Sequence, residues 1–344
     1  MTDTGPARQR IDPDALKMFS FQLFSKLEGA ITSGMIHLGD RMGLYRLMAS
    51  FVEPVTSHAM AARAELDERW VREWLHNQAA AGIVSWSADD DNGERYWLSP
   101  EAKAVLADPH HPAFGMGMFH RLPQTMQTLH HLPESFRTGV GYDYDAHGEE
   151  GATGIERSFE PWYRNFLVPV ALPMLDGVTD RLSAGATVAD VGCGAGVAVC
   201  LIAKAFPASE VHGYDISHHA LKRAEHRKHE QGLQNAHFHD PRVEPLPVDN
   251  SVDLVTTFDC IHDMTHPAEV MRAIRSALRP DGVWLLVDIK ARDTFAENVK
   301  KNPMASMMYG ISVYSCMASA LSAPDGAGLG TLGLSESLAR EMTE

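Results

Sequence analysis

The stretch TVADVGCGAGVAVCLIAKAFP, residues 187–207, changes character along its length. It begins as a short apolar strand, passes through Gly192, Gly194 and Gly196, and ends as an apolar helix. A turn that needs one positive φ is satisfied by a single glycine. Three alternating glycines in one turn therefore predict that something outside the backbone, a bound ligand, comes very close to it.

Acidic residues stand at the ends of the predicted strands. Asp190 ends the first strand, and Asp215 ends the second, in EVHGYDIS, nineteen residues after Gly196. The third strand ends in HFHDP with Asp240, and the fourth ends in VTTFDCIHD with Asp259. In a parallel sheet these ends share one edge, where ligands bind. Asp215 is placed to accept both hydroxyls of a ribose, and Asp240 to face the exocyclic amine of an adenine.

The glycine spacing differs from the dinucleotide fingerprint GxGxxG, whose third glycine would stand at Val197. An acid two residues before the first glycine, Asp190, is also foreign to that fingerprint. Nicotinamide binding therefore stays only the second alternative for the cofactor.

Strands alternate with helices through residues 181–344, which predicts an α/β fold with a parallel sheet and helices on both faces. The expected strands are residues 187–191, 210–214, 235–239, 252–257 and 282–288. The expected helices are residues 195–206, 218–231, 267–278, 304–322 and 333–342.

The ordered set VADVGCGAG, GYDIS, HDP, LPVDNSVDLVTTF and LRPDGVWLLVD resembles the class I S-adenosylmethionine-dependent methyltransferases over residues 185–290. The resemblance implies a Rossmann-like sheet, S-adenosylmethionine as cofactor and a small-molecule methyl acceptor. The cofactor-binding residues that it implies are Asp190, Gly192, Gly194, Gly196, Asp215, Ile216, Asp240, Pro241, Phe258 and Asp259.

In such a site the glycine turn is no phosphate cradle, because this cofactor carries no phosphate. Gly192 and Gly194 let the backbone lie flush against the amino acid and ribose of the ligand, so that a Cβ at either position would overlap the cofactor. Gly196 permits close packing of helix on strand. Asp190 orients the loop or meets the ligand's ammonium group.

The resemblance implies methyl transfer by in-line displacement, and a general base matters only if the acceptor is protonated at neutral pH. The candidates are His262 and Asp263, just past the fourth strand. His120, His130 and His131 are the alternatives in the middle of the chain. Metal-dependent relatives carry a carboxylate cluster near the fourth strand, which DCIHDM does not supply, so no metal is expected.

Residues 12–108 read as helices followed by a β-wing. A long apolar helix over 14–31 precedes two further helices with Thr56 and Asp67 as N-caps, and the polar turn SADDDNGE joins two strand patterns. The second helix has mixed charge, and the wing tip carries Asp89, Asp90 and Asp91, whereas a DNA-binding wing needs basic residues. The module therefore favours dimerisation or closure of a pocket over DNA binding, as in bacterial small-molecule methyltransferases.

Residues 109–180 are rich in Met, His, aromatics and proline. The stretch GVGYDYDAHGEEGATG, residues 139–154, predicts a long, partly exposed loop, which either lines the substrate pocket of the domain at 181–344 or is a plain connector. Residues 302–324 are uncharged but contain five serines and two prolines, which favours a buried helix over a membrane span.

The composition bounds the partners. The formal charge of −15 disfavours nucleic acid and anionic membranes. The four cysteines lack metal-site spacing, and the polar N-terminus lacks a signal sequence, which together predict a cytoplasmic protein.

Relatives of this kind close the sheet with a sixth strand and an antiparallel seventh, whereas this sequence stops at ESLAREMTE. We therefore expect a sheet that is truncated after its fifth strand, with an open apolar edge or one covered by a partner. Two functions remain open: a methyltransferase acting on oxygen or nitrogen of a small molecule, and a non-catalytic, cofactor-binding regulator with a winged helix.

Overall fold

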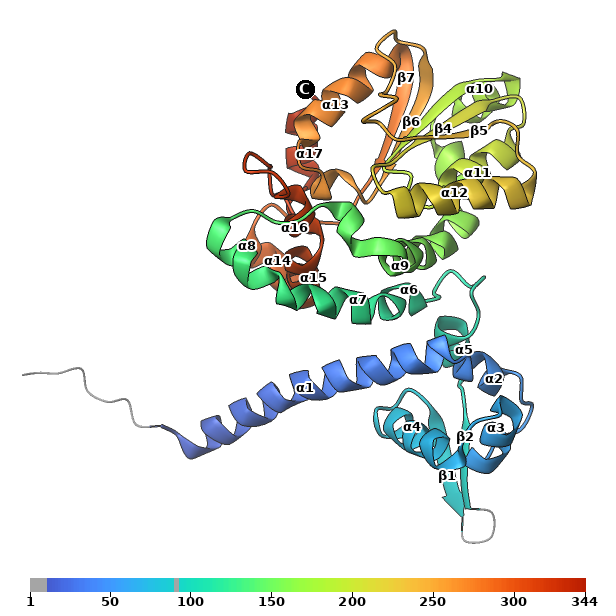
Figure 1. Ribbon diagram of the computed structural model, residues 1–344, viewed down its shortest axis with the longest axis vertical. Coiled ribbons are helices and arrows are strands. Elements are labelled where there is room, and N and C mark those ends of the chain that lie inside the picture. The colour runs from blue at the N-terminus through green and yellow to red at the C-terminus, as the bar shows by residue number, and fades with distance from the viewer. Residues whose placement is uncertain (1–10, 90–92) are drawn as a thin grey trace, which may run out of the picture. The chain divides into compact units, whose positions relative to one another are not determined.

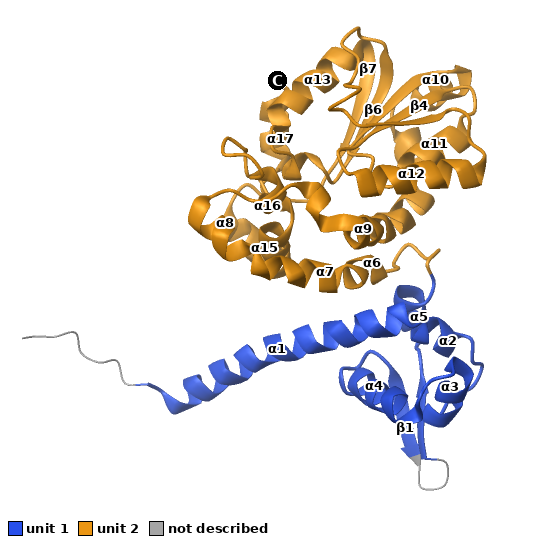
Figure 2. Cartoon of the chain, viewed as in Figure 1, with its two compact units in different colours: residues 1–108 blue, residues 109–344 orange. Residues whose placement is uncertain are grey.

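The computed structural model describes residues 11–89 and 93–344. The chain divides into two compact units, residues 1–108 and residues 109–344 (Figure 2). Asp90 and Asp91, predicted at the wing tip, lie outside the described residues, as does the N-terminal stretch up to Arg10.

The first unit consists of helices followed by a hairpin. Its elements are α1 (Pro13–Arg41), α2 (Leu44–Ala49), α3 (Ser57–Ala64), α4 (Glu68–Ala80), β1 (Ser85–Asp89), β2 (Gly93–Trp97) and α5 (Pro100–Leu106). The predicted N-caps are confirmed, because Thr56 accepts a hydrogen bond from the backbone N–H of Ala59 and Asp67 accepts from that of Arg69. Helix, turn, helix and antiparallel hairpin together form the predicted winged helix.

Helix α1 is longer than the apolar stretch at 14–31 predicted. Its last turns bury Ile36 and Gly39, and Tyr45 and Trp74 pack closely where Gly39 lacks a side chain. This packing explains why the helix continues to Arg41. The first turns of α1 leave their large apolar side chains exposed to solvent.

The second unit is built on a five-stranded sheet in the order β5-β4-β3-β6-β7, with every pair parallel. The strands are β3 (Thr187–Val191), β4 (Glu210–Tyr214), β5 (Ala236–His239), β6 (Val252–Phe258) and β7 (Leu278–Val287). All five strands were expected from the sequence, within a few residues at each end. Among the described residues β7 pairs with β6 alone and is an edge of the sheet.

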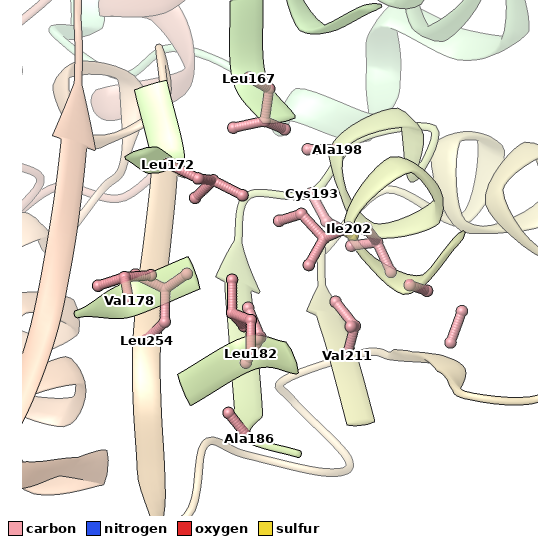
Figure 3. Packing of buried hydrophobic residues seen from close by; sticks show 14 of the residues in the cluster. Leu167, Leu172, Val178, Leu182, Ala186, Cys193, Ala198, Ile202, Val211 and Leu254 are labelled. Carbon is pink, nitrogen blue, oxygen red and sulfur yellow. The ribbon is translucent and has the colours of Figure 1, made fainter. Parts of the chain in front are cut away.

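Helices cover both faces of this sheet (Figure 1). Helix α10 (Val178–Ala184) precedes the first strand, and the helices between the strands are α11 (Val197–Ala205), α12 (His218–Gln231) and α13 (Pro267–Ala277). One face packs Val188, Val211 and Leu254 against Leu182 and Ile202 of α10 and α11 (Figure 3). The other face packs against α13. Burial of this apolar area holds the strand ends in fixed positions.

The residues between the two expected domains are more helical than the sequence predicted. They form α6 (Met116–His120), α7 (Leu122–Gln127), α8 (Leu132–Thr138), the 3-10 turn η2 (Tyr144–His147), α9 (Gly148–Trp162) and the π-helical η3 (Tyr163–Ala171).

The expected loop at 139–154 is therefore wrong in its second half, where α9 begins. The glycines there serve close packing rather than flexibility. A Cβ at Gly154 would lie 2.6 Å from Cβ of Arg121, and one at Gly117 would meet the backbone of Ser158.

The C-terminal part consists of α14 (Phe295–Lys301), α15 (Ala305–Tyr314), α16 (Cys316–Ala320) and α17 (Glu336–Thr343). The single helix expected at 304–322 is broken at Ser315, whose φ of −145° and ψ of −81° are not helical. Within the described ranges, no helix is both long and apolar enough to cross a bilayer.

Candidate functional site

The glycine turn joins β3 to α11, and all three glycines have positive φ. A Cβ at Gly196 would lie 2.5 Å from the Phe238 ring, and one at Gly192 would lie 2.7 Å from Sγ of Cys260. Protein packing therefore requires glycine at both positions. At Gly194, in contrast, no atom lies within 4 Å of the position that a Cβ would take. A Cβ at Gly192 would thus already clash with Cys260 in the protein itself, and its predicted clash with a cofactor stays a prediction. Gly194 is the glycine of the turn with open space beside its Cα.

Asp215 follows β4 and fixes this turn. Its Oδ2 accepts from the backbone N–H of Gly194 at 2.8 Å, and its Oδ1 accepts from that of Ser217 at 2.8 Å. Burial raises the pKa of Asp215. The next residue, Ile216, is 38% exposed although it is apolar. A carboxylate beside an exposed apolar side chain suits a ribose with a flat base attached, and the assignment of Asp215 and Ile216 to the cofactor stays a prediction.

Asp240 and Pro241 follow β5. Both oxygens of Asp240 accept hydrogen bonds from the Arg242 guanidinium, which also donates to the carbonyl of Ile216 at 2.8 Å. The hydrogen bonds from Arg242 lower the pKa of Asp240 to about 2. Arg242, which the sequence analysis did not single out, thus links the ends of β4 and β5.

Asp190 lies beneath the glycine turn and is 1% exposed. The Thr256 hydroxyl donates to its Oδ1 at 2.6 Å, and burial raises the pKa of Asp190 to about 7. This contact agrees with the expected orienting role, because it anchors the end of β3 to β6. Contact with a ligand ammonium group stays a prediction.

Phe258 and Asp259 end β6. Phe258 is 7% exposed and packs in the core against the rings of Trp162 and Tyr163, at centroid distances of 5.9 and 5.1 Å. Asp259 has a φ of +54°, which is unusual for a non-glycine residue, and its Oδ1 is buried without a hydrogen-bond partner. Burial raises the pKa of Asp259 to about 6.

His262 lies in the short turn η5 (Ile261–Asp263) directly after β6 and is 1% exposed. Its Nδ1 contacts Oδ1 of Asp288 at 2.6 Å. Burial lowers the pKa of His262, but hydrogen bonds to Asp288 and Cys316 and the charges of Asp263 and Asp288 outweigh it and raise the pKa to about 12. Burial also raises the pKa of Asp263, to about 7.

Asp288 is the residue of this site that the sequence analysis missed. It follows β7, the neighbour of β6, and its Oδ2 is buried without a partner. A polar residue at the end of a strand adjacent to β6 was the available signal, since it belongs to the same sheet edge. The dyad is His262–Asp288, with Asp263 beside it.

Three carboxylates therefore meet at His262. Asp259 and Asp263 belong to DCIHDM, and the third, Asp288, follows β7. Ligand atoms of Asp259, His262 and Asp288 lie within 4.8 Å of one another, as do those of His262, Asp263 and Cys316. The Nδ1 atom of His262 is already hydrogen-bonded to Asp288, and the expectation of a metal-free site stays a prediction.

The 3-10 turn η2 lies over this edge of the sheet. Ser217 at the start of α12 donates to Oδ1 of Asp145 at 2.6 Å. Tyr144 is close enough to Asp215 and Asp263 for their charges to raise its pKa, after the larger effect of burial. Tyr144 is thus a second residue near the site that sequence reasoning missed.

The histidines proposed as alternatives lie elsewhere. His130 and His131 are exposed, and His120 forms an ion pair with Glu150 at 2.8 Å. The buried histidine of this region is His147, which contacts Ser315 Oγ at 3.0 Å. Burial and the charge of Arg121 lower the pKa of His147 to about 3, so it is neutral at pH 7.

The parallel sheet in this order, with a glycine turn after β3 and an acid after β4, agrees with the methyltransferase resemblance of the sequence. Residues 182–333 match the family model described as a methyltransferase domain, and residues 30–108 match that of the Rv2258c-like winged HTH domain. The chain therefore carries a winged helix-turn-helix domain followed in sequence by an S-adenosylmethionine-dependent methyltransferase domain.

Related sequences and structures agree with this assignment. A ubiquinone biosynthesis O-methyltransferase of Neisseria meningitidis is 28% identical over 137 residues, which are 39% of this chain and 52% of that protein. The chain thus matches about half the length of this curated relative. Human N-acetylserotonin methyltransferase, solved with S-adenosylmethionine, has a TM-score of 0.63 at 16% identity and covers 90% of this chain and 88% of its own.

An O-methyltransferase family protein from Burkholderia thailandensis has a TM-score of 0.58 at 17% identity, over 97% of this chain and 93% of its own. At such identities the solved structures show a shared fold.

Proposed function

We propose that this protein transfers the methyl group of S-adenosylmethionine to a hydroxyl oxygen of a small molecule. The observation that carries the proposal is the buried His262–Asp288 dyad at the strand ends next to the glycine turn. A hydroxyl needs a base before it attacks, and an imidazole held by a carboxylate is such a base. The matching of O-methyltransferases by sequence supports oxygen over nitrogen.

The residues of the chain would hold the cofactor at the open face of Gly194. Asp215 would accept hydrogen bonds from the ribose, with Ile216 against the adenine and Asp240 near its amine. The ammonium group of the ligand would lie toward Asp190. S-adenosylmethionine supplies an electrophilic methyl group on a sulfonium that is already a good leaving group.

The protein then aligns the acceptor oxygen with the methyl carbon and excludes water. Alignment of this kind contributes about 7–11 kcal/mol to lowering a barrier. With S-adenosylmethionine bound as the methyl donor, Nε2 of His262 in its neutral form would accept the proton that the acceptor hydroxyl loses on methylation. Asp288 holds the imidazole by Nδ1 and stabilises its protonated form.

The test is calorimetric titration of S-adenosylmethionine into the wild-type protein and into Gly194→Val. We expect binding by the wild type and a loss of at least tenfold in affinity for the variant, because the β-branched side chain would occupy the open space beside Gly194. Equal affinities at unchanged melting temperature would refute the assigned cofactor site. Conversion to S-adenosylhomocysteine with phenolic acceptors then tests the transfer itself.

The winged-helix unit is inferred to dimerise rather than to bind DNA. On α4 the basic residues pair with acids: Arg69 with Glu73 at 2.5 Å, and Arg72 with Glu68 at 3.5 Å. Paired arginines have little charge to offer a phosphate backbone. In contrast, a stripe of exposed apolar side chains on α1 offers area for a second copy, namely Leu16, Phe19, Leu23, Phe24, Leu27 and Ile31.

A further inference from the structure

Arg121 is a buried cation of the second unit. It lies between α6 and α7 and is 3% exposed. Its Nη2 donates to Ser315 Oγ at 3.3 Å, and its Nε is buried with no hydrogen-bond partner. Among the residues that the structure describes, no carboxylate oxygen lies within 4.0 Å of this guanidinium. Charged side chains are almost never buried unless they are paired.

The groups around Arg121 are neutral and polar. Ser315 Oγ also contacts Nε2 of His147, whose Nδ1 contacts Nε2 of Gln124 at 3.1 Å. Oε1 of Gln124 is a second buried atom without a partner. None of these groups supplies a negative charge to the guanidinium.

Arg121 is tied to the reaction site by consecutive residues of the chain. Ser315 contacts Arg121, and the next residue, Cys316, lies with its Sγ within 4.8 Å of the ligand atoms of His262 and Asp263. The break between α15 and α16 at Ser315 turns the two side chains toward these two partners. Tyr144 lies close enough to Arg121, Asp263 and Asp215 for the charge of each to shift its pKa, after the larger effect of burial.

Through Ser315 and Cys316 the fold therefore brings a cation, Arg121, into the neighbourhood of the carboxylates and the base at His262. Asp259 Oδ1 and Asp288 Oδ2 are unpartnered acceptors near His262. A ligand that satisfies both the cation and these acceptors has a hydroxyl group to donate and an anionic group to accept.

We propose that Arg121 binds a carboxylate of the methyl acceptor, so that the acceptor is a hydroxylated carboxylic acid whose hydroxyl faces His262. This inference rests on the proposed function, because it places the acceptor beside the base of the transfer. The planar guanidinium presents donors in a fork that matches a carboxylate, and the ligand would give Arg121 the counter-charge that the fold withholds.

The experiment uses benzoate, the three monohydroxybenzoates and their methyl esters, titrated calorimetrically into the full chain with S-adenosylhomocysteine present and absent. We expect each free acid to bind at least tenfold more tightly than its ester, because the ester has no charge to offer Arg121. In Arg121→Met this preference should vanish while ester binding stays unchanged. Arg137→Met, at an exposed arginine paired with Glu134, should keep the preference.

The melting temperature of the unliganded protein gives a second measurement. Removing an unpaired buried charge should leave Arg121→Met as stable as the wild type or more stable, whereas an arginine that holds the fold together would destabilise on removal. If the variant fails to fold, or if wild type binds esters as well as acids, the proposal is overturned. If the wild type does not bind S-adenosylhomocysteine, the proposed function is refuted instead. The two failures can be told apart because carboxylate binding is also measured without S-adenosylhomocysteine.

Discussion

Single residues decide the electrostatics of the candidate site. Asp259, Asp263 and Asp288 meet at His262, and only one positive charge, that of the protonated imidazole, is available among the four. This arrangement stabilises the imidazolium, so that His262 is a strong base but is rarely in the neutral form that can accept a proton. The sulfonium of a bound cofactor would disfavour the imidazolium, and so would favour the neutral form that accepts a proton.

The pH profile tests this arrangement. The base must be neutral to act, and the pKa of His262 is raised to about 12 in the unliganded protein. We therefore expect kcat/KM to rise through the whole alkaline range up to about pH 9, with a slope of up to tenfold per pH unit. Asp288→Asn removes the charge that raises this pKa, so the rise should move to lower pH, while the maximal rate falls because the ring is held less firmly.

Steady-state rates of S-adenosylhomocysteine formation between pH 6 and 9.5 measure both effects. A flat profile for the wild type, or one that Asp288→Asn leaves unmoved, would contradict the role of His262 as the base.

Asp190 makes stability depend on pH in the opposite sense from an ordinary paired carboxylate. Its pKa is raised from 3.8 to about 7, so the folded state holds a proton that the unfolded state has lost between these values. Stability from this group is therefore present at low pH and lost as the pH rises toward 7. One pKa unit corresponds to about 1.4 kcal/mol, so the loss is on the order of a few kcal/mol.

We expect the unliganded protein to melt at a higher temperature at pH 5 than at pH 8, and Asp190→Asn to remove much of the difference. The asparagine keeps an acceptor for the Thr256 hydroxyl and carries no charge. Calorimetric melting of both proteins at the two pH values measures it. An unchanged difference in the variant would show that Asp190 is ionised in the folded protein.

At the scale of elements, the strands were predictable and the packing of the middle helices was not. Each strand from β3 to β6 is a short segment with an acid at or just after its end, so its place follows from local pattern alone. The acids at the glycine turn were found for the same reason. Asp288 was missed although it also follows an apolar strand, β7, whereas Arg121, between two short helices, has no local pattern that predicts its burial.

The misassigned stretch at 139–154 has a physical explanation. Glycines read as loop signals by propensity, yet in α9 they let another helix approach closely. Tertiary packing thus overrides their low helix propensity. In the same way the break at Ser315 follows from contacts with Arg121 and His147, residues more than 160 positions away in the sequence.

A substitution at the α6–α9 contact tests this explanation. In Gly117→Ala the new Cβ would lie 2.6 Å from Cα of Ser158, which is backbone and cannot turn aside. We expect a loss of about 1–3 kcal/mol in the free energy of unfolding. Gly310→Ala is the matched control, because Gly310 lies inside α15 with no atom within 4 Å of its Cβ position, and there alanine should stabilise slightly.

Urea unfolding monitored by far-UV circular dichroism gives both values. Equal stabilities for the two variants would mean that α6 and α9 do not pack as closely as the structure describes.

At the scale of the whole molecule, the net charge and the exposed apolar side chains indicate which partners the chain can bind. The chain has a net charge of −15, which disfavours binding to the phosphate backbones of nucleic acids. Helix α1 exposes large apolar side chains to solvent. Phe19 is 64% exposed and Leu23 is 60% exposed. A monomer rarely leaves so continuous an apolar face uncovered, so a second copy of the chain is the expected occupant.

The substitution Leu23→Asp puts a charge in the middle of this face, whereas Ser25→Asp puts the same charge on the opposite side of α1. We expect the wild type and Ser25→Asp to sediment at twice the 37.8 kDa of one chain, and Leu23→Asp to weaken association at least tenfold, because the carboxylate would lose its water on docking. Analytical ultracentrifugation at micromolar concentrations measures this. A wild type that sediments as one chain there would leave α1 exposed for some other reason, and the dimer would have to be abandoned.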